Sequence, residues 1–248
     1  MKKYILPLCA ALLSIICGCS DFAGEPITKD FTIDGPFTEL IVRDSFNVTE
    51  NNEVDRITVT AGENIMPKVV VENVDGTLII QLKRWGVFRN GYSSLKVTLP
   101  YMPDLKRIEL SGASEMHAEY CPRVGEGSTI CLSGGSVYTG SILSQGLELV
   151  MSGASKANLT GRANSLRIDL SGASYLFTGN QPYPFNNYYG FFCNTCEGEM
   201  SGGSNACFHC DGRIKLNLSG ASKLHYSGNA TTGDCRVSGG STITHDTL

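Results

Sequence analysis

The sequence predicts an all-β chain, a β-solenoid whose coils are about 19 residues long. The first observation is a four-residue phrase, Ser-Gly-Ala-Ser or Ser-Gly-Gly-Ser, that occurs seven times in 248 residues. The copies begin at Ser111, Ser133, Ser152, Ser171, Ser201, Ser219 and Ser238. The second is their spacing of 22, 19, 19, 30, 18 and 19 residues. The third is the alternation of apolar and polar residues on both sides of each phrase, which is the period of a β-strand.

Each repeat is expected to contain two strands and two corners. The residues one and three positions before the phrase are mostly apolar, as Leu170 and Ile168 are before Ser171. The second residue after the phrase is mostly apolar too, as in Leu176. The glycine of the phrase supplies the positive φ that a tight corner needs. In most repeats a further glycine, such as Gly179, marks the second corner.

A column of outward residues is predicted to form a ladder along one sheet. Four positions before each phrase stand Arg107, Thr129, Glu148, Arg167, Glu197, Lys215 and Asp234. From Glu148 onward the sign of the charge alternates from coil to coil. Neighbouring strands lie about 4.8 Å apart, so these side chains would pair along the stack. We interpret the column as a solvated structural ladder.

The start of the chain has the pattern of an export signal. Lys2 and Lys3 precede a short apolar run, and Ile16-Cys17-Gly18-Cys19 resembles a bacterial lipobox. We therefore expect residues 1–18 to be a lipoprotein signal peptide, with Cys19 lipidated and residues 19–29 as a tether. An uncleaved signal anchor is the alternative. The lipid would attach the protein to a membrane of the Gram-negative cell envelope, and we favour the outer membrane.

Residues 30–105 are expected to form irregular coils of the same sheets, ahead of the regular coils of residues 106–248. Apolar alternation continues here, as in Leu78 and Ile80, and Asp75-Gly76 marks a turn. No linker-like composition precedes Ser111. The two parts are therefore expected to share one stack.

Four stretches carry a family resemblance. They are Phe37-Thr38-Glu39-Leu40, Asp75-Gly76-Thr77-Leu78, Val97-Thr98-Leu99-Pro100 and residues 105–114. With the repeated phrase, they make residues 30–248 resemble the bacterial head-GIN-domain family of putative auto-transporter adhesins. The resemblance implies a right-handed parallel β-helix of pectin-lyase-like architecture. It also implies lipoprotein export and an adhesive role without assigned catalytic residues.

Two Cys-x-x-Cys pairs are the sharpest local signal. Cys193 and Cys196 form one pair, Cys207 and Cys210 the other, with ten residues between them. The cell envelope favours disulfides, so these four cysteines are disulfide candidates. Zinc is an alternative, because two thiolate pairs can complete a tetrahedron, and reduced thiols are another. No other cofactor is expected.

The longest step contains an insertion, which we place at residues 180–198. Six of the twelve residues 181–192 are aromatic, and the preceding coil points two aromatic side chains outward by the same column count. We interpret these aromatics as a surface that binds a glycan or a surface protein. The candidates are Tyr175, Phe177, Tyr183, Phe185, Tyr188 and Tyr189. The cysteine pairs would fasten the insertion there; packing as a small satellite cluster is the alternative.

Two carboxylates raise the question of an enzyme. Asp169 and Glu199 share an outward column on adjacent coils, and glycan-cleaving enzymes use paired acids. The same face also carries Arg167, Glu197 and Lys215, so the charges are balanced and a solvated surface pair is the better interpretation. A formal charge of −4 without a basic face argues against nucleic-acid binding.

These observations favour a non-enzymatic cell-envelope lipoprotein that acts as an adhesion or binding module. The alternatives are a polysaccharide-processing β-helix enzyme and a purely structural scaffold. Either would use the same fold, and a homo-oligomer is compatible with all three.

Overall fold

The computed structural model describes residues 23–83, 95–118, 123–124, 127–178 and 190–246. Their regular structure consists of strands, apart from one turn of 3-10 helix, η1 (Met66–Lys68). The prediction of an all-β chain is confirmed. The predicted signal peptide and Cys19 lie outside the described residues. Within the described part, no helix is long and apolar enough to cross a membrane.

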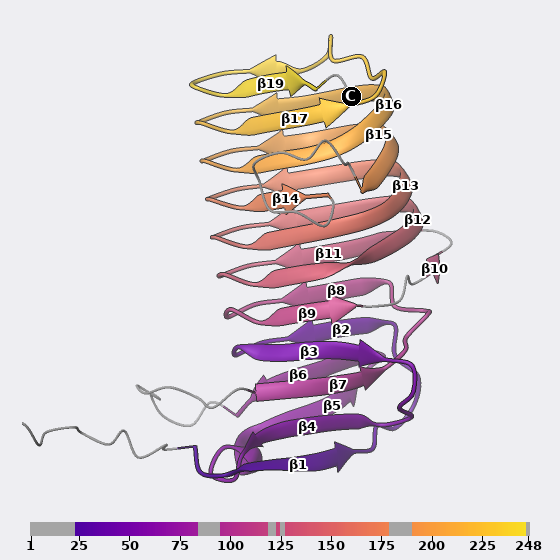
Figure 1. Cartoon of the computed structure of the whole chain (residues 1–248), viewed down its shortest axis with the longest axis vertical. Helices are drawn as coiled ribbons and strands as arrows, with labels where there is room; N and C mark the ends of the chain where they lie inside the picture. Colours follow the sequence, from indigo (N-terminus) through magenta and orange to yellow (C-terminus); the bar gives the residue numbers. More distant parts are fainter. Residues whose placement is uncertain (1–22, 84–94, 119–122, 125–126, 179–189, 247–248) are drawn as a thin grey trace, which may run out of the picture.

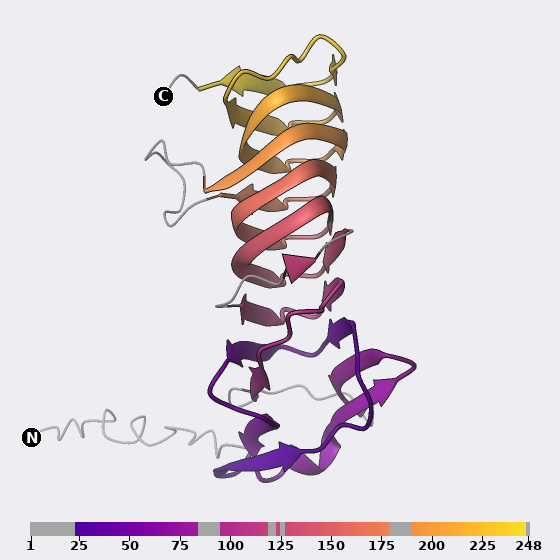
Figure 2. The ribbon, with the colours of Figure 1, turned by 90° about the vertical axis from the view of Figure 1, so that its right-hand side faces the viewer.

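From β8 onward the chain is wound into a stack of coils (Figures 1 and 2). The strands are β8 (Arg107–Leu110), β9 (Glu115–Ala118), β10 (Arg123–Val124), β11 (Ser128–Leu132), β12 (Val137–Met151), β13 (Lys156–Leu170), β14 (Tyr175–Phe177), β15 (Phe191–Met200), β16 (Asn205–Leu218), β17 (Lys223–Ser227), β18 (Arg236–Val237) and β19 (Thr242–His245). Neighbouring coils pair in parallel. β12 and β13, for example, run from Val137 opposite Lys156 to Met151 opposite Leu170. The offset of 19 residues is the predicted coil length.

The repeated phrases stack along one edge of the coils, and the stacking explains their glycines. The N–H of each phrase's first serine donates to a carbonyl of the neighbouring coil, as Ser171 does to Met151 at 2.9 Å. The glycine in second position has a φ between 64° and 78° in all seven phrases. At Gly172 and Gly202, a Cβ would lie 2.5 Å from the carbonyl oxygen of the corresponding glycine one coil earlier. Conformation and space therefore both require glycine.

The last serine of the phrase points into the stack. Six of these serines are 0% exposed: Ser114, Ser136, Ser155, Ser174, Ser204 and Ser222. Their hydroxyls donate to backbone carbonyls, in most cases that of the phrase's first serine, as Ser174 does to Ser171 at 2.9 Å. Because each of these six hydroxyls has a partner, they avoid the cost of unpaired buried polar groups.

Apolar side chains fill the interior of the coils. In β12, Tyr138, Ile142, Leu149 and Met151 turn inward and are at most 2% exposed. Equivalent columns in the other coils join them in one continuous core. A single coil could not bury such a face alone, so stability comes from stacking.

The N-terminal part differs from the irregular coils expected for residues 30–105. Its strands are β1 (Pro26–Phe31), β2 (Glu39–Val42), β3 (Phe46–Asn51), β4 (Ile57–Gly62), β5 (Val69–Val74), β6 (Thr77–Leu82) and β7 (Leu95–Pro100). Three pairs, β1–β4, β4–β7 and β5–β6, are antiparallel. The antiparallel pairing of β5 and β6 follows from the short connection between them. Asp75 and Gly76 have φ values of 51° and 84° and form a hairpin turn. Residues 26–29, which we expected in the tether, belong to β1.

The spatial order of the first coils also differs from their order in the sequence. β2 lies between β6 and β8, and β3 lies between β7 and β9, all in parallel. The corner of this coil replaces the repeated phrase with Asp44 and Ser45, whose φ values are 67° and 64°. Ser111 N–H donates to Val42 O across the junction at 2.9 Å. The sheets of the N-terminal part thus run on into the regular coils, with β2 and β3 pairing directly with β8 and β9 although β6 and β7 follow them in the sequence.

The insertion is shorter than predicted. β13 pairs with β14 through Asn158 and Phe177, and with β15 through Gly161 and Phe191. Residues paired between β13 and the following coil thus differ in number by 19 at Phe177 and by 30 at Phe191. The 11 extra residues therefore lie between Phe177 and Phe191. Residues 191–198, which we assigned to the insertion, are ordinary residues of β15. Their alternating burial, with Phe191 inside and Phe192 outside, shows that the coil has already resumed.

The outward charges form the expected ladder over part of its length. Arg167 makes ion pairs with Glu148 at 3.6 Å and with Glu197 at 3.3 Å. Lys215 follows next to Glu197 in register. These side chains are about half exposed, so each pair contributes less than about 1 kcal/mol.

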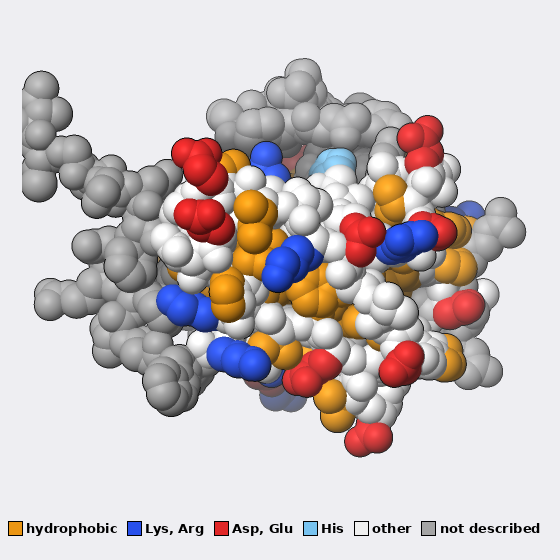
Figure 3. Space-filling model, turned by 90° about the horizontal axis from the view of Figure 1, so that it is seen from below, with side chains coloured by type: hydrophobic (Ala, Val, Ile, Leu, Met, Phe, Trp, Pro, Cys, Tyr) orange, Lys and Arg blue, Asp and Glu red, His pale blue; other side chains and the backbone are white. Residues whose placement is uncertain are grey.

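The two ends of the stack present different surfaces. Seen from the N-terminal end, hydrophobic side chains lie among charges of both signs (Figure 3). At the C-terminal end, the short strands β18 and β19 leave Val237 50% exposed. The last coil thus covers the core beneath it but is itself incompletely buried.

Candidate functional site

A shallow groove of about 680 Å³ runs over the charge ladder. Its walls include Glu148, Arg167, Glu197 and Lys215. Because acidic and basic side chains alternate and largely pair with one another, a ligand would have to displace existing ion pairs. The groove is therefore a weaker candidate for a ligand site than a second hollow elsewhere on the surface of the stack.

An outward column of mixed character crosses four coils beside that second hollow. Register places Leu143 next to Arg162, Arg162 next to Phe192, and Phe192 next to His209. We call these four residues the outer ladder. Leu143 is 45% exposed and Phe192 44%, which is unusual for large apolar side chains in this chain. The ring centroids of Phe192 and His209 lie 4.9 Å apart.

The second hollow, of about 470 Å³, lies along the outer ladder. Leu143, Arg162 and Phe192 line it, together with Asn194 and Asp211. Apolar surface and a few convergent polar groups are the usual composition of a ligand site. Among the described residues, no ion pair occupies the Arg162 guanidinium, so its planar donors can face a ligand.

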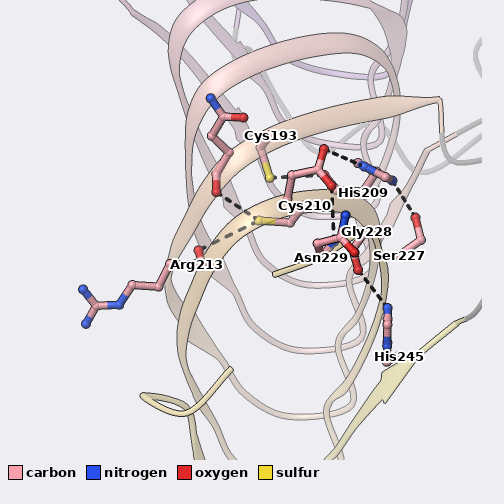
Figure 4. A network of polar contacts seen from close by, with 10 residues as sticks. Cys193, His209, Cys210, Arg213, Ser227, Gly228, Asn229 and His245 are labelled. Carbon is pink, nitrogen blue, oxygen red and sulfur yellow. Dashed lines mark hydrogen bonds and ion pairs between the residues drawn. The ribbon is translucent and has the colours of Figure 1, made fainter. Parts of the chain in front are cut away.

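A polar network fixes the end of the outer ladder (Figure 4). His209 Nε2 lies 3.0 Å from Asp211 Oδ2, and His209 Nδ1 lies 2.9 Å from Ser227 Oγ. The Asn229 N–H donates to Asp211 Oδ1 at 3.2 Å. The hydrogen bonds from His209 and Asn229 lower the pKa of the Asp211 carboxyl, so it is ionised at neutral pH. The imidazole is therefore held in one orientation against Phe192.

Serine, histidine and aspartate together invite comparison with a hydrolase triad. Here Ser227 is 0% exposed, whereas a nucleophile must reach its substrate. Asp211, by contrast, is exposed at the surface. The array is suited to orienting His209 rather than to attacking a bond.

Behind the outer ladder, two thiols face each other inside the stack. Cys193 and Cys210 are register partners on β15 and β16, and both are at most 4% exposed. Cys193 Sγ donates to His209 O, and Cys210 Sγ to Asn194 O, each at 3.4 Å. The proximity of the two thiols, together with burial, raises the pKa of Cys193, and the same proximity lowers the pKa of Cys210.

The other two cysteines of the predicted set lie elsewhere. Cys196 is buried between Leu166 and Ile214 in its column, and burial raises the pKa of its thiol. Cys207 faces outward next to His225. In the described residues, no group of three or more His, Cys, Asp or Glu side chains is placed to hold a metal ion.

The predicted aromatic surface is only partly within the described residues. Tyr175 and Phe177 are half-buried on the outer face, with ring centroids 5.6 Å apart and planes 7° apart. They lie on β14, next to Lys156 and Asn158 of β13. The remaining candidates, Tyr183, Phe185, Tyr188 and Tyr189, lie outside the described residues.

The two carboxylates considered for an enzyme are neighbours, as expected. Asp169 and Glu199 are in register on β13 and β15. The Asn217 amide, one coil further, donates to Glu199 at 3.5 Å. Neither carboxylate lines the groove or the hollow.

Sequence reasoning missed Leu143, Arg162, Phe192 and His209 as a group. The signal was available in the columns, because Leu143 and Arg162 are 19 residues apart. Phe192 is the next residue of this column. It was not recognised because we assigned it to the insertion in the 30-residue step. Correct placement of the 11 extra residues before Phe191 would have aligned Phe192 with Leu143 and Arg162, whereas His209 lies 17 residues after Phe192 and is paired with it through an irregularity in the register of β15 and β16.

The family comparison gives one match. The family model described as "Putative auto-transporter adhesin, head GIN domain" matches residues 36–230. No curated protein matches the chain.

Solved structures share the fold at low sequence identity. A putative adhesin from Bacteroides fragilis NCTC 9343 is 19% identical with a TM-score of 0.75, covering 90% of this chain and 97% of that one. A putative adhesin from Parabacteroides merdae ATCC 43184 is 19% identical with a TM-score of 0.64, covering 90% and 97%. A putative lipid binding protein from Parabacteroides distasonis ATCC 8503 is 15% identical with a TM-score of 0.64, covering 90% and 98%.

Proposed function

The chain belongs to the head GIN domain family of putative auto-transporter adhesins, and from that premise we propose that it is a non-enzymatic binding module of the cell envelope whose ligand is a glycan. One observation carries the proposal. The hollow sets the exposed apolar faces of Leu143 and Phe192 beside Arg162, Asn194 and Asp211. A sugar has the same two sides: apolar C–H groups that pack on a ring, and hydroxyls that hydrogen-bond to planar polar groups.

The outer face extends this site beyond one sugar unit. Phe177 is next to Asn158, four residues before Arg162 on β13. Four strand residues span at most about 13 Å, and the strand bends at Gly161, whose φ is 100°, so the Tyr175–Phe177 pair and the hollow could contact one chain that follows the coil around this corner. The regular coils hold the Tyr175–Phe177 pair and the hollow at a fixed distance from each other. The expected ligand is therefore an oligosaccharide or polysaccharide.

We infer that the stack is a right-handed parallel β-helix of pectin-lyase-like architecture. Its support is the parallel, in-register pairing of successive coils and the strong preference for right-handed connections between parallel strands. Such a stack presents long, rigid faces, which suit an elongated ligand.

The alternatives have less support. A polysaccharide-processing enzyme would need a reactive group at a cavity, and the Ser227 hydroxyl is buried. A purely structural scaffold would not explain why Leu143 and Phe192 stay exposed beside a hollow.

A glycan array tests the function directly. The full chain should bind a defined subset of oligosaccharides, and Arg162→Gln should weaken that binding by about 10- to 100-fold, because a charged hydrogen bond contributes about 1.5–3 kcal/mol. Lys96→Gln, at an exposed position of β7 in the N-terminal part of the chain and outside both the hollow and the Tyr175–Phe177 pair, is the control and should retain affinity. Absence of binding to any glycan, combined with binding to lipid vesicles, would contradict the proposal.

The proposed location has its own test. Replacing Cys19 by alanine should remove the lipidation site and move the protein from the membrane fraction to the soluble fraction. Cys17→Ala leaves the proposed lipidated residue in place and should keep the protein on the membrane. Fractionation of both variants, followed by immunoblotting, measures the difference. A Cys19→Ala protein that still needs detergent for release would rule out the lipid anchor.

A further inference from the structure

We propose that Cys193 and Cys210 form a disulfide that ties β15 to β16 directly behind the outer ladder. The two residues are opposite each other in register. Adjacent strands lie about 4.8 Å apart, within the roughly 4.4–6.8 Å between Cα atoms that a disulfide spans. Both side chains are buried on the inner face, so their sulfur atoms share one enclosed space.

No other described cysteine pair has this geometry. Cys196 is flanked in register by Leu166 and Ile214, and Cys235 lies beyond Ile214, to whose carbonyl its thiol donates. Cys131 is flanked by Glu109 and Val150, and Cys207 pairs with His225. Among the described residues, the register therefore selects one pairing from the several that four cysteines would allow.

The reaction is ordinary thiol–disulfide exchange. The thiolate of one cysteine attacks a sulfur of an oxidant disulfide, forms a mixed disulfide and expels a thiolate. The second cysteine, once deprotonated, attacks the mixed disulfide and expels the other oxidant thiolate. The protein loses two protons and two electrons, and the oxidant becomes two thiols. The oxidant is a protein or small-molecule disulfide of the cell envelope.

The link would have a consequence for binding. Phe192 precedes Cys193, and His209 precedes Cys210, so the covalent bond lies one residue from the ring contact at the hollow. It closes a loop that runs through the corner at Ser201 and contains residues 193–210. Cross-linking would fix the spacing of Phe192 and His209 before a ligand arrives, which lowers the cost of ordering them.

Mass spectrometry of the exported full chain tests the pairing. The protein is unfolded without reductant, its free thiols are alkylated, and the chain is cleaved with cyanogen bromide after Met200, which separates Cys193 from Cys210. The two fragments should remain joined until reductant is added. The Cys196→Ser/Cys207→Ser variant should keep the joined fragments, whereas Cys193→Ser should lose them. Alkylation of both Cys193 and Cys210 in the wild-type protein would overturn the proposal.

A stability measurement supports the assignment independently. Reductant should lower the Tm of the wild type and of the Cys196→Ser/Cys207→Ser variant by roughly 6–12 °C. It should not change the Tm of Cys193→Ser/Cys210→Ser; equal sensitivity of all three would contradict the link. The inference needs export to the envelope but no glycan, so its failure would leave the array result unaffected.

Discussion

Replacing Gly202 by alanine should lower the free energy of unfolding by about 2–5 kcal/mol. Two costs add up at this corner. Gly202 has a φ of 70°, where a Cβ clashes with the backbone. The added Cβ would also lie 2.5 Å from Gly172 O and 3.0 Å from Gly172 N, and these backbone atoms belong to the neighbouring coil. Relief would require the two coils to separate, with loss of the hydrogen bond from Gly203 N–H to Gly172 O.

The next residue provides the matched control. Gly203 occupies the third position of the phrase, where other coils carry alanine, and a Cβ there would approach no closer than 3.9 Å to Gly172 O. Gly203→Ala should therefore change stability by less than about 0.5 kcal/mol. Urea unfolding followed by circular dichroism measures both variants. Equal effects would show that the corners do not stack as described.

Replacing Phe191 by alanine should cost about 3–5 kcal/mol of stability, because it leaves a cavity in the core. The side chain is 0% exposed and lies at the point where the coil resumes after the insertion. Phe192 is the natural control, since it is adjacent in sequence but 44% exposed. Phe192→Ala should change the free energy of unfolding by less than about 0.5–1 kcal/mol.

Thermal unfolding of the two variants side by side tests the register of β15. If residues 191–198 belonged to the insertion, the two phenylalanines would be equivalent and their replacements would have similar effects. A large loss at Phe192 with little at Phe191 would mean that the strand is out of register by one residue. Such a shift would also turn Cys193 away from Cys210.

The regular coils could be predicted from sequence because their signals are local and repeated. Each phrase carries its own corner glycine and buried serine, and each flanking strand has period two. The N-terminal coils lack the repeated phrase with its corner glycine and buried serine. Asp44 and Ser45 form a corner without glycine, and the placement of β2 between β6 and β8 depends on pairing between distant segments.

In the candidate site, too, some residues could be placed from local sequence signals and others could not. The outward orientation of Tyr175 and Phe177 followed from counting columns in a regular coil. Phe192 and His209 could be aligned only after the extra residues had been placed before Phe191. The cysteines illustrate the limit of motif spacing: their Cys-x-x-Cys pattern suggests one cluster, but alternation and coil register put Cys207 on the outer face and Cys193 opposite Cys210.

The most direct test of the binding proposal is a calorimetric titration with an oligosaccharide that the array identifies. Phe192→Ala should weaken binding about tenfold or more, because it removes the aromatic face on which the sugar would pack. Val74→Ala removes a side chain of similar exposure, 45%, from the N-terminal part of the chain and should leave the affinity unchanged. Unchanged affinity in the Phe192→Ala variant would contradict a glycan site at the outer ladder.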